Sequence, residues 1–225
     1  MKKTSLAICG LFLLTTGLHA QGFVNLDFES AKIQPIAGSP YFPYGIASTN
    51  ALPGWTVFSG ASSQPDISYN DPAIGSTWVN LWATNGQNIE GSFSVLLQGG
   101  LSASFASIVQ TGAVPASAQS ILFKAQYFLA PGVSNGISLS LGGQNIPFYS
   151  LSTGPNYTLY GGDISAFAGL TEALAFTAYN VSQDNDWNID SIVFSTSPIS
   201  EPTAFSLFAL GGLLIGCRQW RNSKR

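Results

Sequence analysis

The sequence predicts an all-β domain, an antiparallel β-sandwich, preceded by a signal peptide and followed by one short C-terminal transmembrane helix. Between residues 22 and 197 no helical periodicity is sustained. Short runs rich in β-branched and aromatic residues instead alternate with Gly, Pro, Asn and Ser. About eight to ten such runs at this spacing are typical of two antiparallel sheets packed face to face.

The first 20 residues predict an export signal. Lys2 and Lys3 give a basic start, and an apolar stretch runs from Ser5 to Leu18. Ala20 then precedes Gln21 at a position that signal peptidase recognises. We therefore expect cleavage after Ala20 and a mature domain that spans residues 21–198.

Within that domain, one predicted strand carries a distinctive alternation. In the run from 78 to 83, Trp78, Asn80 and Trp82 share one face of the strand. Gly142-Gly143 predicts a hairpin between 137–141 and 144–148, and 33–53 and 61–76 are expected to be loops. The predicted strands are 78–83, 93–98, 105–110, 120–129, 137–141, 156–160, 173–180 and 188–195.

Charge and residue usage exclude several classes of function. Between residues 21 and 199 there are two lysines and ten acidic residues, a net charge of −8. This excludes a nucleic-acid partner and favours divalent cations or neutral polymers such as glycans. The same span has no Cys, His or Arg, which excludes disulfides, Ser-His-Asp or Cys-His catalysis and zinc bound through imidazole.

The C-terminal residues 199–225 predict a membrane segment with a fixed orientation. An apolar run of 15 residues, 203–217, rises about 22 Å as a helix, and inclusion of Trp220 extends the expected helix to 203–220. The basic end, 218–225, follows with no cation just before the helix. We therefore expect the domain outside the inner membrane, with a cytoplasmic membrane-stop made of Arg218, Arg221, Lys224 and Arg225.

This ending resembles the PEP-CTERM sorting tail of exopolysaccharide-producing bacteria. Glu201 and Pro202 match its Pro-Glu-Pro motif, and Ser200 stands where the first proline is usual. The resemblance implies processing by an exosortase-type membrane protease, after signal peptidase has removed the signal peptide. It further implies temporary anchoring through the helix and a final place at the cell surface or in the extracellular matrix. The alternative is an ordinary tail anchor.

A second resemblance covers the two ends of the domain. The segments are Asn25-Leu-Asp27-Phe28-Glu29, Leu52-Pro53-Gly54-Trp55 and Trp187-Asn-Ile189-Asp190-Ser-Ile192. They resemble a galactose-binding-like jelly roll of the kind found in carbohydrate-binding modules. The resemblance implies adjacent first and last strands and a structural Ca²⁺ held by Glu29 and Asp190, with Asp27 as a further ligand. Carboxylate oxygens suit Ca²⁺; the alternative is a solvated acidic loop in which Asp190 caps a turn.

The face shared by Trp78, Asn80 and Trp82 is the predicted ligand site. Sugar rings stack on aromatic side chains beside amide groups, so this set suits a glycan. The alternative for each aromatic residue is packing within the sandwich.

Together these features predict an exported, exosortase-sorted protein with a non-catalytic domain that binds glycan or exopolysaccharide. We therefore expect no enzyme activity and no catalytic residue. One alternative is a glycoside hydrolase or polysaccharide lyase that uses paired carboxylates, for which Glu29, Glu90 and Glu172 are the glutamates between residues 21 and 199. A purely structural or adhesive matrix protein is the other.

Overall fold

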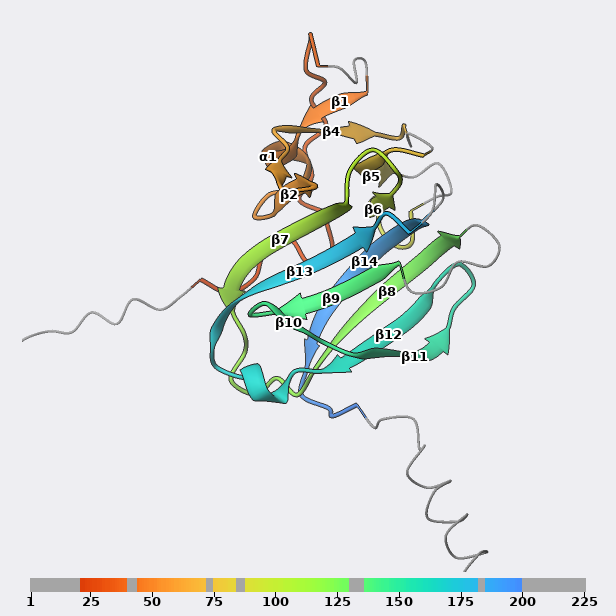
Figure 1. Ribbon diagram of the computed structural model, residues 1–225. Helices are drawn as coiled ribbons and strands as arrows, with labels where there is room; N and C mark the ends of the chain where they lie inside the picture. The colour runs from red at the N-terminus through yellow and green to blue at the C-terminus, as the bar shows by residue number, and fades with distance from the viewer. Residues whose placement is uncertain are drawn as a thin grey trace, which may run out of the picture.

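Two β-sheets stacked face to face make up the domain in the computed structural model (Figure 1). The structure describes residues 21–39, 44–71, 75–83, 88–129, 136–181 and 185–199. The predicted signal peptide, the sorting motif and the membrane helix lie outside these residues. A mostly antiparallel β-sandwich is therefore confirmed for the described part of the chain.

Among the described residues, the larger sheet has eight strands and the smaller has six. In spatial order the larger contains β1 (Gly45–Ala47), β4 (Asp66–Tyr69), β5 (Thr77–Ala83), β6 (Phe93–Gly99), β14 (Asn185–Ser195), β8 (Ser120–Leu129), β12 (Thr158–Asp163) and β11 (Phe148–Thr153). The smaller contains β10 (Gln144–Asn145), β9 (Ile137–Leu141), β13 (Thr171–Tyr179), β7 (Phe105–Ala113), β2 (Thr56–Ser59) and β3 (Ser62–Ser63). A short helix α1 (Ser48–Ala51) and a 3₁₀ turn η1 (Ser165–Phe167) complete the elements.

One strand pair departs from the antiparallel prediction. β4 and β5 run parallel, with Ser68 opposite Asn80 and Tyr69 opposite Leu81. The segments 33–53 and 61–76, which were predicted to be loops, contain the strands β1, β3 and β4. Each of these strands is only two to four residues long. Runs this short give no readable period-2 alternation.

The predicted hairpin at Gly142-Gly143 is confirmed, but its second strand is shorter than expected. Both glycines have positive φ, 60° and 75°, as a two-residue hairpin turn requires. β10 ends at Asn145, and β11 begins at Phe148 in the other sheet. Pro147 lies between them and has no N–H to donate to a ladder.

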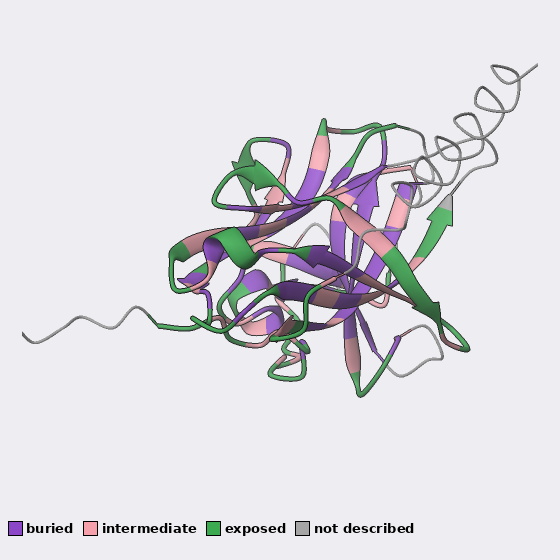
Figure 2. Cartoon of the chain, turned by 90° about the horizontal axis from the view of Figure 1, so that it is seen from below, coloured by how far each residue is buried: buried purple, intermediate pink, exposed green. Residues whose placement is uncertain are grey.

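The hydrophobic core fills the space between the sheets (Figure 2). Val79 and Leu81 of β5 point into it, as do Val95 and Leu97 of β6, all at most 1% exposed. Each such side chain contributes roughly 1.5–3 kcal/mol of burial free energy. Trp55 and Trp187 also lie in this core.

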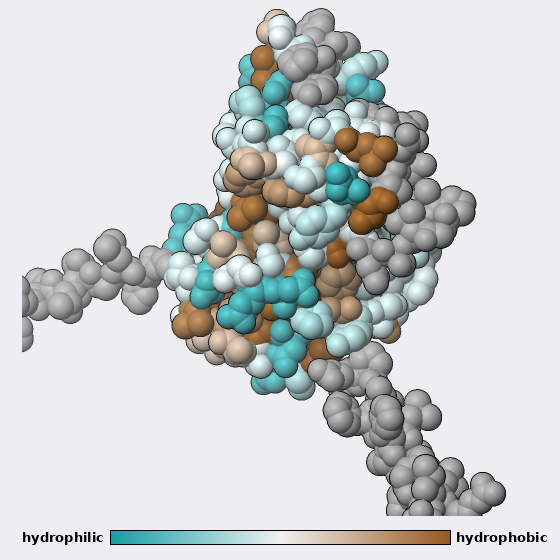
Figure 3. Space-filling model, viewed as in Figure 1, coloured by the Kyte–Doolittle hydropathy of each residue, from teal (hydrophilic) through white to brown (hydrophobic). Residues whose placement is uncertain are grey.

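No helix among the described residues is long and apolar enough to cross a membrane. The predicted span 203–220 is not among them. On the face in view in Figure 3, hydrophobic residues are interspersed with hydrophilic ones.

A β-bulge near the end of β14 brings the chain's first described segment against its last strand. The register with β8 shifts between Asp190 and Val193, and Ser191 takes a positive φ of 49°. Beyond the bulge, the Ile192 N–H donates to the Leu26 carbonyl at 2.9 Å. This contact positions Asp27 and Glu29 beside Asp190.

Candidate functional site

An acidic pocket lies where the first described segment meets β14. Its volume is about 200 Å³, and Gly91 and Ser191 complete its lining. The structure thus places the three predicted calcium ligands around one pocket, together with a fourth carboxylate that the resemblance did not supply. The acidic members of the pocket are Asp27, Glu29, Glu90 and Asp190.

Asp190 is the buried member of the pocket, only 1% exposed. Its Oδ2 accepts the Glu90 N–H at 2.9 Å and its Oδ1 accepts the Ser191 N–H at 2.6 Å. The pKa of Asp190 is raised to about 7, chiefly by burial and in smaller part by the charges of Glu29 and Glu90, against the lowering effect of the two backbone donors. Asp190 therefore holds its proton at a pH where an ordinary aspartate is ionised.

Glu29 fixes the turn that leads into β6. Its Oε1 accepts the N–H groups of Ser92 at 2.8 Å and Phe93 at 3.0 Å. Gly91 precedes them with a φ of 58°, and a Cβ there would collide with the Glu29 carboxylate. Asp27 supports the arrangement, since its Oδ1 accepts the Glu29 N–H at 3.3 Å.

Glu90 forms an ion pair with Lys124. Its Oε2 accepts from Lys124 Nζ and from Ser191 Oγ, the latter at 2.7 Å. The Lys124 ammonium, followed by the Ser191 hydroxyl, lowers the pKa of Glu90. Lys124 also lies 4.9 Å from the centre of the Tyr157 ring. Sequence reasoning missed this pair because its members are 34 residues apart.

The described residues contain no group of three Asp, Glu, His or Cys side chains arranged to hold a metal ion. Glu29 and Asp190 would therefore supply two carboxylates to a Ca²⁺. The rest of its six to eight oxygens would have to come from backbone carbonyls and water. Asp184, six residues before Asp190 in the sequence, lies outside the described residues.

A second site lies on the opposite side of the eight-stranded sheet from the core. The outward side chains of β4, β5, β6 and β14 alternate with the core residues, yet most are buried as well. We call this set the polar face. Its buried members are Ser68, Asn80, Ser94, Gln98 and Asn188, each 0% exposed, and Trp82, 5% exposed.

Several polar atoms of this face have no hydrogen-bond partner among the residues that the structure describes. They are Ser68 Oγ, both amide atoms of Asn80, Trp82 Nε1 and Ser94 Oγ. A buried unsatisfied polar group costs about 1–3 kcal/mol. Ser68 lies opposite Asn80 and Trp82 lies opposite Ser94, so these atoms are concentrated on three adjacent strands.

An aromatic contact spans the polar face. The rings of Trp82 in β5 and Phe128 in β8 meet edge-on, with centroids 6.0 Å apart. β6 and β14 lie between those strands, so in a flat sheet the two backbones would be about 14 Å apart. The rings therefore meet over the intervening strands, and Leu96 of β6 is 0% exposed although it points away from the core.

The residues predicted to bind glycan, Trp78, Asn80 and Trp82, share this face, but they do not form an exposed surface. Trp82 is buried and Trp78 is half-buried, whereas Phe128 is 42% exposed. Sequence reasoning did not find Ser68, Ser94 or Phe128. Because side chains alternate along a strand, the sequence could have indicated that Ser94 shares a face with Leu96. It did not indicate which strands lie beside β5.

A wider groove of about 640 Å³ adjoins the acidic pocket on the outside of the same sheet. It shares Asp27, Glu90 and Ser191 with that pocket and includes Lys124. Apolar side chains line the rest, among them Leu122, Leu159 and Val193.

No known protein family and no curated protein matches the sequence. Two solved structures are similar to the chain at low identity. A cyclase from Fischerella sp. TAU, in complex with 4-(1H-indol-3-yl)butan-2-one, is 13% identical and aligns over 81% of this chain and 99% of its own, with a TM-score of 0.45. The apo form of a cyclase from Fischerella sp. is 12% identical over 77% of this chain and 93% of its own, with a TM-score of 0.43.

These structures correct the prediction that the domain is not an enzyme, because both similar chains are enzymes. Composition excluded mechanisms that need Cys, His or Arg, but it did not exclude chemistry by carboxylates. At this identity and TM-score neither the cyclase activity nor its substrate is carried over to this chain.

Proposed function

We propose that the chain is an exported surface protein whose β-sandwich, a galactose-binding-like jelly roll, binds a saccharide at the polar face. The observation that carries the proposal is the set of unpartnered buried polar atoms on β4, β5 and β6. A protein interior satisfies nearly all of its buried polar groups. When unsatisfied polar groups are concentrated on one face, we expect that face to be a binding site for a polar ligand, which would satisfy them when it binds.

The chemistry of these atoms matches sugar hydroxyls. The Asn80 amide donates and accepts, the Ser68 and Ser94 hydroxyls do both, and the Trp82 indole donates. A hydroxyl group also does both, so one sugar ring can satisfy several of these atoms. The aromatic rings at this face supply the apolar surface on which a sugar ring stacks.

The test is a glycan array with two asparagine variants. Asn80→Ala should abolish the glycan signal, because it removes two of the unpartnered atoms. Asn145→Ala is the matched control, since Asn145 is exposed on β10 of the other sheet. Equal signals from wild type and Asn80→Ala would rule out the polar face as the binding site.

Ca²⁺ at the acidic pocket is the second part of the proposal. Asp190 is buried beside two other carboxylates, and a divalent cation would replace the proton that it otherwise keeps. We expect Ca²⁺ to raise the melting temperature by several degrees and EDTA to reverse it, because a ligand at 100 times its Kd adds about 2.7 kcal/mol. Asp190→Asn should remove the effect and Asp163→Asn, which lies on β12, should keep it. An unchanged melting temperature in wild type would exclude a structural Ca²⁺.

Export and sorting by the exosortase route rest on residues 1–20, Ser200, Glu201, Pro202 and the basic end. Replacement of Glu201-Pro202 by Ala-Ala should trap the chain in the inner-membrane fraction, whereas the parent chain should move to the surface or medium. Equal release of both would show that the tail is an ordinary anchor.

One observation favours a second candidate function, hydrolysis by paired carboxylates. Asp190 and Glu90 line the same pocket with pKa values shifted in opposite directions, which is the pattern of a general acid beside an ionised partner. Hydrolysis of dyed polysaccharides that vanishes in Glu90→Gln would establish it. Glu172→Gln is the control, since Glu172 lies on β13 of the other sheet.

A further inference from the structure

A carboxylate lies among the aromatic side chains of the polar face. Asp186 is opposite Gln98 on one side and Phe128 on the other, and Gln98 is in turn opposite Trp78. These four side chains form one row across β5, β6, β14 and β8. Asp186 is half-buried and its Oδ1 has almost no contact with solvent.

The row lies at the accessible margin of the polar face. Trp78 and Asp186 are half-buried and Phe128 is 42% exposed, whereas Asn80 and Ser94 are 0% exposed. A ligand that reaches the unpartnered atoms therefore also meets two aromatic rings and one carboxylate.

The charge around this row is predominantly negative. Between residues 21 and 199 the cations are Lys32 and Lys124. Lys124 is committed to Glu90 and the Tyr157 ring, and it lies four residues from Phe128 along β8, about 13 Å in a strand. Lys32 is exposed and precedes β1. The field of a domain with net charge −8 also attracts cations.

We infer that the saccharide bound at the polar face carries a cationic nitrogen, as in an amino sugar without its acetyl group. This inference rests on the proposed function and specifies its ligand. A carboxylate with one aromatic ring opposite it and a second in the same row attracts an ammonium group by charge, and the rings add cation–π interaction. A neutral N-acetyl sugar gains neither attraction, and an acidic sugar would be repelled.

The test compares two oligosaccharides with the same backbone, hexa-glucosamine and hexa-N-acetylglucosamine. Calorimetric titration of the full-length chain at about pH 6 keeps the amine largely charged, because an amino group beside electron-withdrawing substituents, such as a peptide α-amino group, titrates near 8. We expect hexa-glucosamine to bind at least about tenfold more tightly, and the advantage to shrink as salt screens the charge.

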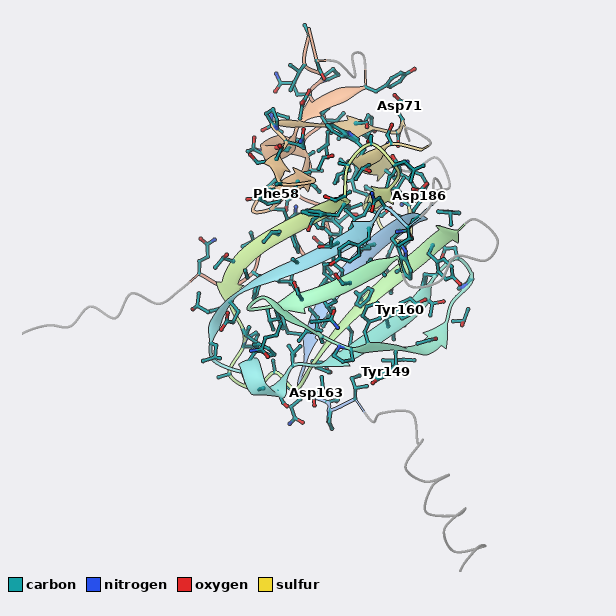
Figure 4. The ribbon with its side chains drawn as sticks, viewed as in Figure 1. Phe58, Asp71, Tyr149, Tyr160, Asp163 and Asp186 are labelled. Carbon is teal, nitrogen blue, oxygen red and sulfur yellow. The ribbon has the colours of Figure 1, made fainter. Side chains whose placement is uncertain are left out.

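Asp186→Asn should abolish this preference while it keeps the shape of the side chain. Asp163→Asn makes the same change in net charge at the far end of the molecule (Figure 4) and should leave the preference intact. If the Asp186 variant fails to fold, salt dependence in the wild type decides, because an uncharged mode of recognition has none.

The outcomes separate the two proposals. Equal affinity for both oligosaccharides, or a preference that survives Asp186→Asn, overturns the cationic ligand and leaves saccharide binding in place. Absence of binding by either oligosaccharide, together with a blank glycan array, overturns the proposed function itself.

Discussion

Two buried asparagines on opposite sides of the eight-stranded sheet differ in how their amides are used. Asn185 points to the core side of β14, where its Nδ2 donates to the carbonyls of Gly136 at 2.8 Å and Tyr179 at 2.7 Å. Its Oδ1 accepts from Trp187 Nε1 at 3.1 Å. Asn80 points to the outer side of β5, and neither of its amide atoms has a hydrogen-bond partner in the described part of the chain. Both residues are 0% exposed.

The difference shows that burial alone does not identify a structural residue. The Asn185 amide joins three segments and stabilises the fold, since each satisfied hydrogen bond contributes about 1 kcal/mol. The Asn80 amide contributes none, and its burial is a cost to the folded state. A protein that keeps such a group is expected to use it for something other than stability.

The largest effect should come from Asn185→Ala. Loss of the amide removes three hydrogen bonds and leaves the Trp187 indole N–H without its acceptor, while the Gly136 and Tyr179 carbonyls each keep one backbone donor. We expect the unfolding free energy to fall by about 3 kcal/mol, about 1 kcal/mol for each lost bond. Urea denaturation measures it. A loss below about 1 kcal/mol would remove the contrast between the two asparagines.

The next largest effect should come from Asp190 in the acidic pocket, as a dependence of the unfolding free energy on pH. The pKa of Asp190 rises from 3.8 in the unfolded chain to about 7 in the folded one. Between these values the unfolded chain has lost a proton that the folded chain keeps, so in EDTA the unfolding free energy should fall as pH rises. The full linkage value is about 1.4 kcal/mol per pH unit. Across the roughly three pH units of this window the full value comes to about 4 kcal/mol. We expect a decrease of roughly 2 kcal/mol, about half of that total, because water that reaches the pocket screens the carboxylate.

Asp190→Asn is the check on that assignment. Asn does not titrate, so urea denaturation of this variant should show a much flatter profile over the same range. A slope equal to that of the wild type would assign the titration to another group. Added Ca²⁺ should also flatten the wild-type profile, because the cation takes the place of the proton.

Asn80→Ala should change stability far less than Asn185→Ala. Removal of the unpaired amide recovers its burial penalty, and the space left behind offsets part of that gain. We expect a change within about 1 kcal/mol, in the direction of greater stability. A loss as large as that of Asn185→Ala would mean that the Asn80 amide is satisfied in solution.

The smallest effect on stability should come from Trp82→Phe. It keeps an aromatic ring against Phe128 and removes one unpartnered N–H, so we expect the unfolding free energy to change by less than about 0.5 kcal/mol. Affinity for the saccharide should nevertheless fall by about tenfold, the value of one hydrogen bond. Unchanged affinity would exclude the indole N–H from ligand contact.

The sequence was informative where local chemistry decides structure. Strands 120–129 and 137–141 have the predicted bounds, because their alternation and flanking residues are local. Trp78, Asn80 and Trp82 share a face because side chains alternate along any strand. The absence of Cys, His and Arg between residues 21 and 199 determined which chemistries are excluded without reference to any fold.

Tertiary structure decided the properties that depend on distant segments. Alternation set which residues share a face with Asn80, but only the order of β4, β5, β6, β14 and β8 buried that face and brought Phe128 to Trp82. The pairing of Glu90 with Lys124 and the raised pKa of Asp190 arise in the same way. Burial and charge coupling depend on what is nearby in space, and a sequence specifies directly only what is nearby along the chain.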